Sequence, residues 1–159
     1  LTPMEKTNVM RILDKSGIAY SAYEYDKTLT DGMSVAETLG KSPETVFKTL
    51  VTVSGDNRHF VFVIPVEKTL DLKKAARAAG VKSVSMLKQK ELLPTTGYIH
   101  GGCSPIAMKK KFATVIDETA LLSDAICFSA GKVGYQVEMS PRVLAEFIGA
   151  DFADVTESL

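Results

Sequence analysis

The chain has 159 residues, of which 45% are hydrophobic and 24% charged, and its 19 basic and 19 acidic residues give a net charge of zero. This length fits a single domain, spanning residues 1–159, with enough apolar side chains for a core. Because no global charge draws the chain onto DNA or a membrane, neither is expected as a partner, and contact with any polyanion must come from a local patch.

The first half of the chain alternates between helical and strand patterns. Thr2-Pro3-Met4-Glu5 has the form of a capping box and predicts a helix that ends at Gly17. Ser34-Val35-Ala36-Glu37 predicts a second, short helix that ends at Gly40. The other elements predicted here are a strand at 18–25, a loop at 27–33, a strand at 46–53, a hairpin turn at 54–57, a strand at 59–64 and a helix at 70–79.

The second half has shorter elements and more turns. A last helix is predicted from Ser140-Pro141 to Ile148, where Gly149 ends it. The other predicted elements are a strand at 81–85, a helix at 88–93 ended by Pro94, and strands at 112–116, 125–128 and 133–139. Helices and strands mix without a regular βαβ repeat, so the fold class is predicted to be α+β, with helices flanking a mixed, curved sheet.

Lys48 is the most informative single residue. It lies in the middle of the strand at 46–53, whose two faces are both largely apolar, as in a strand covered on both sides. Lysine is almost never buried without a partner. Either the side chain reaches an edge or pairs with Glu44 or Glu138, or its ammonium group points into a pocket and holds a phosphate, carboxylate or ester oxygen.

Two glycine-containing loops are candidate binding elements. Gly101-Gly102-Cys103-Ser104-Pro105 allows a ligand to approach bare backbone, although the same residues also form ordinary tight turns. Ala130-Gly131-Lys132 is similar in kind: Gly131 permits close approach and Lys132 can meet an anion, and the alternative is a plain hairpin. Gln136 and Glu138 share one face of the next strand, so one of them can form a polar pocket wall.

The usual catalytic side chains are poorly supported by their neighbours. His100 adjoins the first glycine loop, but no acidic residue close in sequence would orient it as a base. The two cysteines, Cys103 and Cys127, lack metal or redox spacing, which is typical of a reducing compartment, and Cys103 is expected to be a small buried thiol. With no long apolar run and no signal peptide recognisable, a soluble, cytoplasmic protein is expected.

A short basic run follows the first glycine loop. Lys109, Lys110 and Lys111 are consecutive. Such a run is usually only a solvated basic face, but beside a pocket it can steer a polyanion.

Five segments together resemble the YbaK-type aminoacyl-tRNA deacylases, relatives of the editing domain inserted in bacterial prolyl-tRNA synthetases, and the resemblance covers essentially the whole chain. The segments are Val46-Phe47-Lys48-Thr49-Leu50, Asp71-Leu72-Lys73-Lys74, Thr96-Gly97-Tyr98, Gly101-Gly102-Cys103-Ser104-Pro105 with Lys109-Lys110, and Ser129-Ala130-Gly131-Lys132.

The resemblance implies an enzyme that removes a wrong amino acid from tRNA, which in YbaK is cysteine from tRNA for proline. Mischarged tRNA is then the partner, through its acceptor end, and a prolyl-tRNA synthetase is a candidate second partner. The family's functional lysine falls on Lys48, and an aromatic residue near its pocket matches Tyr25. Its substrate-gripping loop falls on Gly101, Gly102, Ser104 and Pro105.

The family mechanism in YbaK is substrate-assisted: the cysteine thiol attacks its own ester carbonyl, so neither a metal nor another cofactor is implied. On this interpretation Lys109, Lys110, Lys111 and Lys132 would contact tRNA, and Gly131 would line the substrate site. This chain departs from YbaK at Gln136, where YbaK has an aspartate. The alternatives are an Ala-tRNA(Pro) deacylase of the same fold and a non-catalytic module that binds an aminoacyl end or a synthetase.

Overall fold

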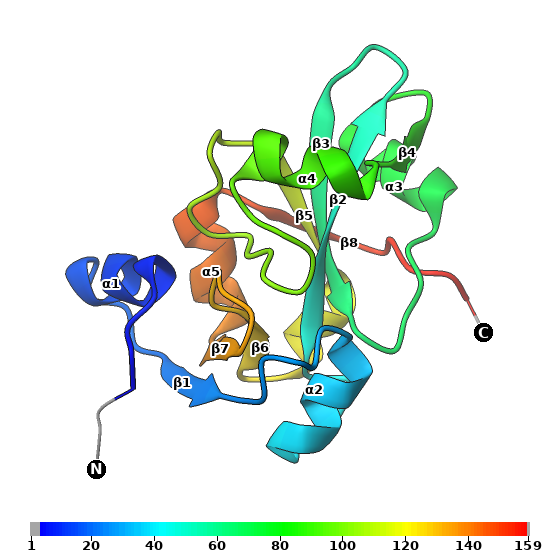
Figure 1. The fold of residues 1–159 in the computed structure, drawn as a ribbon. Coiled ribbons are helices and arrows are strands. Elements are labelled where there is room, and N and C mark those ends of the chain that lie inside the picture. Colours follow the sequence, from blue (N-terminus) through cyan, green and yellow to red (C-terminus); the bar gives the residue numbers. More distant parts are fainter. Residues whose placement is uncertain (1–3, 159) are drawn as a thin grey trace.

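The computed structural model describes residues 4–158, which form five α-helices and eight strands in two sheets (Figure 1). A three-stranded antiparallel sheet has the order β1-β7-β6 and a five-stranded mixed sheet the order β4-β2-β3-β5-β8. The strands are β1 (Ser21–Glu24), β2 (Phe47–Ser54), β3 (His59–Pro65), β4 (Val84–Met86), β5 (Ala113–Asp117), β6 (Ile126–Ser129), β7 (Tyr135–Met139) and β8 (Asp151–Ala153). The predicted α+β class is confirmed.

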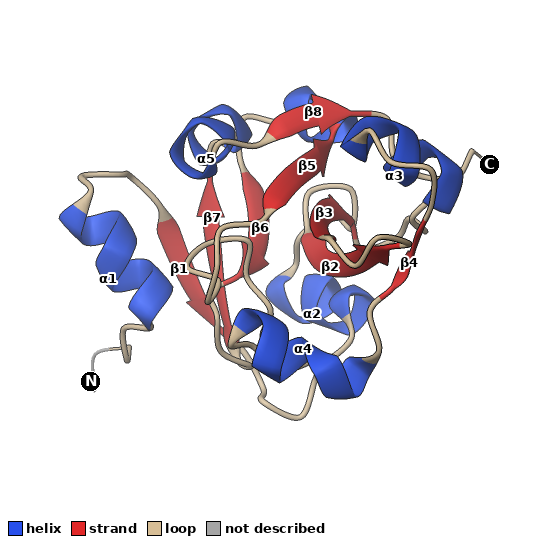
Figure 2. Cartoon of the chain, turned by 90° about the horizontal axis from the view of Figure 1, so that it is seen from above, coloured by secondary structure: helices blue, strands red, loops and turns tan. Residues whose placement is uncertain are grey.

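The helices surround these sheets rather than alternate with the strands. Figure 2 shows α1 outside β1 at one end of the molecule and α3 near β4 and β8 at the other. A short 3-10 helix, Glu118–Leu122, follows β5. The α-helices are α1 (Asn8–Lys15), α2 (Gly32–Leu39), α3 (Leu72–Ala79), α4 (Gln89–Thr96) and α5 (Pro141–Ile148).

The two sheets are connected through the start of β2. Val46 forms an isolated parallel bridge with Cys127 of β6, and the Cys127 N–H donates to the Thr45 carbonyl over 2.8 Å. The largest core cluster lies where the sheets meet α1 and α5, and includes Leu13, Phe47 and Leu144. The first residues of β2 are therefore held by packing and hydrogen bonds on the side of the small sheet.

Two predicted helix starts are wrong. Thr2 and Pro3 lie outside the described residues, and α1 begins at Asn8, capped by Thr7, whose hydroxyl accepts the Met10 N–H over 3.3 Å. Helix α2 begins at Gly32 rather than Ser34, because the Asp31 carboxylate caps it by accepting the Ser34 N–H over 3.0 Å. In both places several cap-forming residues occur close together, and the sequence pattern selected the wrong one.

The prediction that Pro94 ends the helix at 88–93 is wrong. The helix continues to Thr96, because the Thr96 hydroxyl donates to the Leu92 carbonyl over 2.7 Å and the Gly97 N–H to the Leu93 carbonyl over 2.8 Å. Strand β7 begins at Tyr135 rather than at residue 133, since the glycine turn runs on to Gly134. The 3-10 helix and β8 were not predicted.

Candidate functional site

A cavity of about 410 Å³ opens beside the first half of β2 and is called the β2 cavity below. Residues from many parts of the chain line it, chiefly the end of β1, the start of α2, β2 itself, the loop at 100–103 and β7, and Val66, Leu92 and Ser129 complete the wall. Its volume is in the range of about 300–1,000 Å³ that is usual for small-molecule sites. Four of the predicted site residues line it, namely Tyr25, Lys48, Gly101 and Gln136.

The cavity exists because one edge of β2 is only partly covered. Strand β4 pairs with just the last three residues of β2, and β6 reaches this edge only at Val46, so residues 48–50 have no strand on that side. The Val66 N–H donates to the Val46 carbonyl over 2.8 Å, so alternate residues from Val46 onward direct their backbone groups at β3. The backbone groups of Thr49 therefore point the other way, towards the open edge that lines the cavity.

Lys48 has no compensating charge. It is half-buried, and no ion pair or hydrogen bond of its ammonium group occurs within residues 4–158. Burial lowers the pKa of Lys48 below its ordinary 10.5. The predicted alternative of a pair with Glu138 is wrong, because that carboxylate is bound by Lys41 over 3.3 Å.

Two buried side-chain oxygen atoms in the cavity wall are also unpaired. Thr49 Oγ1 and Gln136 Oε1 have no hydrogen-bond partner among the described residues, and Gln136 is 6% exposed. An unpaired buried polar atom costs stability, so such atoms are usual where a ligand completes the bonding. Of the two polar residues predicted as alternatives on β7, Gln136 is the one that lines the cavity.

The glycine loop contributes mainly through its first residue. Gly101 has φ of 85°, and a Cβ there would lie 3.2 Å from the Thr30 Cβ, so the position requires glycine. The Gly102 N–H donates to the Ile99 carbonyl over 3.0 Å, whereas the Gly101 N–H has no acceptor among residues 4–158. The loop thus keeps one backbone donor without an acceptor, on a residue that lines the cavity.

Four predicted binding residues do not line the β2 cavity. Gly102 packs instead against the backbone of Val133, so the two glycine loops contact each other. Ser104 is fully buried and accepts the Ile106 N–H over 3.3 Å, which stabilises the loop from inside. Pro105 lines a separate cavity of about 300 Å³, and Gly131 lines another of about 660 Å³.

The predicted tRNA-binding lysines also lie away from the β2 cavity. Lys109 lines the 660 Å³ cavity, while Lys110 and Lys111 line the 300 Å³ cavity beside the end of α5. Lys132 pairs with Glu5 over 3.1 Å. Contacts of these four lysines with tRNA remain a prediction.

Cys103 and His100 both line the β2 cavity. Cys103 is 8% exposed, and burial raises its pKa to about 12, so it is a neutral thiol near neutral pH. This agrees with the expectation of a small buried thiol. His100 is exposed, and its ring bonds no carboxylate among the described residues.

The sequence reasoning missed the other cavity residues. Thr49 had a usable signal, since it is a hydroxyl in an otherwise apolar strand directly after Lys48. The wall formed by Thr30, Asp31 and Met33 had none, because the pattern indicated a polar loop there. Ser129 reaches the cavity only because β6 pairs with β7, where Ser129 lies opposite Gln136.

Comparison with known proteins identifies the class. A family model for the aminoacyl-tRNA editing domain matches residues 29–147, so the chain belongs to the aminoacyl-tRNA editing domain family. The protein named "Putative Cys-tRNA(Pro)/Cys-tRNA(Cys) deacylase EbsC" from Enterococcus faecalis (strain ATCC 700802 / V583) is 46% identical over 154 residues, 96% of this chain and 94% of that protein. The expected resemblance and the enzyme class, aminoacyl-tRNA deacylase, are confirmed.

More distant proteins also match the chain. The Bacillus subtilis (strain 168) protein YwhH is 24% identical over 124 residues, 78% of each chain. The crystal structure of hypothetical protein APE2540 superposes with a TM-score of 0.87 at 29% identity, over 94% of this chain and 99% of that one. A structure described as "a putative trans-editing enzyme for prolyl tRNA synthetase" has a TM-score of 0.84 at 22% identity, over 98% and 100%, and shows the fold alone.

None of the helices in the described part of the chain is long and apolar enough to cross a membrane.

Proposed function

We propose that this chain removes cysteine from mischarged tRNA(Pro). The observation that carries the proposal is the combination, at one small cavity, of an unpaired ammonium group on Lys48 with two unpaired buried oxygen atoms. The aminoacylated end of a tRNA supplies what these groups lack, because it has a cationic amino group on the amino acid and negatively charged phosphate oxygen atoms on the nucleotides. The relative that is 46% identical is named as a "Putative Cys-tRNA(Pro)/Cys-tRNA(Cys) deacylase", which supports the same activity here.

The cavity accepts the amino acid with its ammonium group inside. Gln136 Oε1 and Thr49 Oγ1 accept hydrogen bonds from that group, and both atoms gain the partner that they lack in the free protein. Gln136 is neutral, so this grip is weaker than a carboxylate would give. The apolar wall formed by Val46 and Val66 suits a small side chain such as that of cysteine.

The reacting ester lies at the mouth of the cavity. The free Gly101 N–H donates to the ester carbonyl oxygen and stabilises the negative charge that develops there. Lys48 holds the oxygen atoms of the terminal nucleotide beside the ester, through ribose or phosphate. These contacts position an ester that is already activated, so positioning and charge stabilisation carry the acceleration.

The substrate's own thiol is the nucleophile. The thiol gives up its proton, its sulfur bonds to the ester carbonyl carbon, and the bond to the ribose oxygen breaks. That oxygen takes up a proton, the tRNA leaves with a free end, and water opens the thiolactone to give cysteine. Cys103 cannot replace this thiol near neutral pH, because burial raises its pKa to about 12.

The direct test is deacylation of Cys-tRNA(Pro) by the purified protein, with Cys-tRNA(Cys) as a second substrate. The expected result is free cysteine and intact tRNA, and loss of turnover when Lys48 is replaced. Faster turnover of Ala-tRNA(Pro) than of Cys-tRNA(Pro) would favour the alanine-specific alternative, and binding without turnover would favour a non-catalytic module.

Two partners accompany this proposal. Mischarged tRNA binds through its acceptor end, and a prolyl-tRNA synthetase supplies it, which places the enzyme in the cytoplasm with the translation machinery. Addition of that synthetase is expected to raise the rate on Cys-tRNA(Pro) at low enzyme concentration. A rate that the synthetase leaves unchanged would count against it as a partner.

A further inference from the structure

A second cavity of about 510 Å³ lies on the other side of Lys48 and is called the α3 cavity below. Lys48 and Leu50 line both it and the β2 cavity, so the two cavities meet at these side chains. Three residues of the segment Asp71-Leu72-Lys73-Lys74, at the start of α3, form part of its wall, namely Asp71, Leu72 and Lys73. The sequence singles out this segment, and the proposed reaction at the β2 cavity gives it no role.

The walls of the α3 cavity combine apolar and basic side chains. Leu72 is 41% exposed and Met86 is 45% exposed, and both line it. Lys73 and Lys48 contribute ammonium groups, Glu157 contributes an exposed carboxylate, and the Asp71 carboxylate also lines the cavity while it caps α3. Exposed apolar side chains between two lysines suit a ligand with a flat apolar ring and a negatively charged oxygen group.

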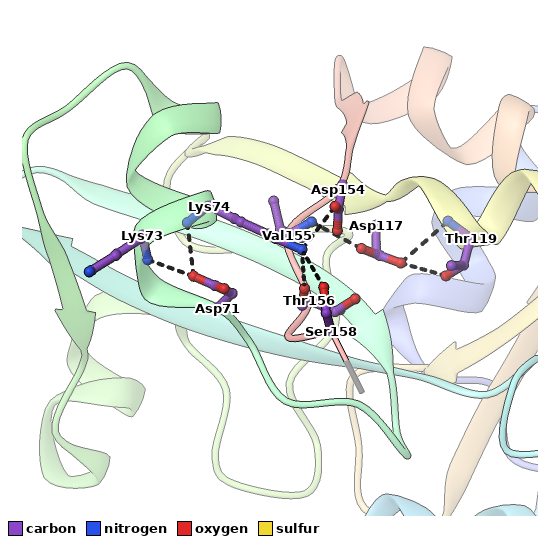
Figure 3. Close-up of polar contacts among 9 residues, drawn as sticks. All are labelled: Asp71, Lys73, Lys74, Asp117, Thr119, Asp154, Val155, Thr156 and Ser158. Carbon is purple, nitrogen blue, oxygen red and sulfur yellow. Dashed lines mark hydrogen bonds and ion pairs between the residues drawn. The ribbon is translucent and has the colours of Figure 1, made fainter.

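The two adjacent lysines of α3 have different partners (Figure 3). Lys74 Nζ is bound by Asp154 Oδ2 over 2.9 Å and by the Thr156 carbonyl over 2.8 Å, which fixes α3 to the C-terminal segment. The Asp71 carboxylate accepts the backbone N–H groups of both lysines, each over 3.0 Å, and caps the helix. The Lys73 side chain points away from this network in Figure 3, and its ammonium group bonds to no residue among 4–158.

We infer that the α3 cavity takes the terminal adenosine of the tRNA, with its base against Leu72 and Met86 and its 5′ phosphate between Lys48 and Lys73. This inference rests on the proposed function. The amino acid is esterified at one side of the terminal ribose and the phosphate is attached at the other. An ester at the mouth of the β2 cavity therefore directs the nucleotide across Lys48, into the α3 cavity, which shares this side chain.

Kinetic measurements on the Lys73→Ala variant test the phosphate contact. Its KM for Cys-tRNA(Pro) is expected to rise about tenfold, and the dependence of log KM on log salt to become shallower by about 0.7, the value for one contact with a single strand. Lys15→Ala, a change of a lysine on α1 that is also exposed, is the matched control and should leave both quantities as in the wild type. A Lys73→Ala variant that behaves like Lys15→Ala overturns the inference.

A binding measurement separates this inference from the proposed function. The trinucleotide CpCpA, which carries no amino acid, is titrated into the protein while the methyl resonances of Leu72 and Met86 are followed by NMR. Both should shift, and Leu72→Ser should weaken binding severalfold, whereas Leu122→Ser, a change of a leucine that is 86% exposed elsewhere, should not. Shifts confined to the region of Lys109 to Lys111 would overturn the α3 site even if deacylation is observed. Shifts at Leu72 and Met86 without deacylation would support the α3 site and contradict the proposed function.

Discussion

Lys48 keeps an ammonium group half-buried with no counter-ion among the described residues, and this has a measurable consequence for stability. Its pKa is lowered in the folded state by burial, so the unfolded chain binds the proton more tightly. The charged group therefore destabilises the fold at neutral pH, and this effect disappears as the pH rises through the folded pKa towards 10.5. A charged residue that lowers the stability of the fold and lines a cavity is a candidate functional residue.

The Lys48→Met variant should be at least as stable as the wild type at pH 7, with the difference in free energy of unfolding shrinking as the pH approaches 10.5. Its turnover of Cys-tRNA(Pro) should fall about 10²- to 10³-fold, the usual effect of removing one charge-stabilising group. Denaturant unfolding and single-turnover deacylation measure the two effects. A stable variant with wild-type turnover would show that Lys48 is not part of the catalytic site.

Two threonines on β2 allow a matched comparison. Thr49→Val removes a hydroxyl that has no partner among the described residues, so stability should be unchanged or higher, while kcat/KM for Cys-tRNA(Pro) should fall severalfold. Thr52→Val removes a buried hydroxyl that donates to the Phe60 carbonyl over 3.0 Å, so it should cost about 1 kcal/mol of stability with no change in kcat/KM. Equal effects of the two substitutions on kcat/KM would remove Thr49 from the substrate site.

A site residue could be predicted from the sequence when its neighbours in the sequence also form its surroundings in the fold. Lys48 is a charged residue within an apolar strand, so its own neighbours marked it. Ser104 and Pro105, predicted to bind substrate, do not line the β2 cavity, because in a loop each successive side chain takes its own direction and no periodicity tells which one faces inward. Tyr25 was predicted only through the resemblance to a family.

At the level of elements, Glu138 connects three strands of the small sheet with the segment after α2. Its carboxylate accepts the Tyr23 hydroxyl over 2.9 Å and the Cys127 thiol over 3.4 Å, and it pairs with Lys41 over 3.3 Å. Burial alone would raise the pKa of Glu138, but these hydrogen bonds and the lysine outweigh it and the pKa is lowered below 4.5. The charged form therefore stabilises the fold.

Glu138→Gln should lower the free energy of unfolding by about 1–3 kcal/mol at pH 7, because it weakens charge-assisted hydrogen bonds. Since the folded pKa is lowered, this loss should be complete above pH 4.5 and should shrink as the pH falls through the folded pKa. Glu146→Gln, on the exposed side of α5, is the control. A difference between wild type and Glu138→Gln that does not change with pH would contradict this account of the cluster.

Elements with a strong periodic pattern were predicted well, and those fixed by distant pairing were not. Strands β2 and β3 and helix α5 differ from their predictions by no more than a residue or so at each end. Strand β8 has only three residues and exists because it pairs in parallel with β5, a contact that no local pattern indicates. The pairing of β1 with β7 likewise brings Tyr23 beside Gln136, although most of the sequence separates these two residues.

For the molecule as a whole, a net charge of zero leaves tRNA binding to local groups. Binding of the isolated protein to tRNA should therefore be weak at physiological salt. If Lys109, Lys110 and Lys111 bind phosphates, changing all three to Gln should make the slope of log affinity against log salt shallower by about 0.7–0.9 for each phosphate that is no longer neutralised. An unchanged slope would show that these three lysines do not bind phosphates, and the tRNA would then be expected to lie on the side of Lys48 and Lys73.

The most direct test of the central claim compares Cys-, Ser- and Ala-tRNA(Pro) as substrates under single-turnover conditions. If the substrate's thiol is the nucleophile, Cys-tRNA(Pro) is cleaved and Ser-tRNA(Pro), which differs by one atom, is cleaved far more slowly, since a thiol is partly ionised near neutral pH and a hydroxyl is not. The Cys103→Ser and Cys127→Ser enzymes should keep the wild-type rate on Cys-tRNA(Pro). Comparable rates on all three esters, or an inactive Cys103→Ser enzyme, would contradict the thiol mechanism.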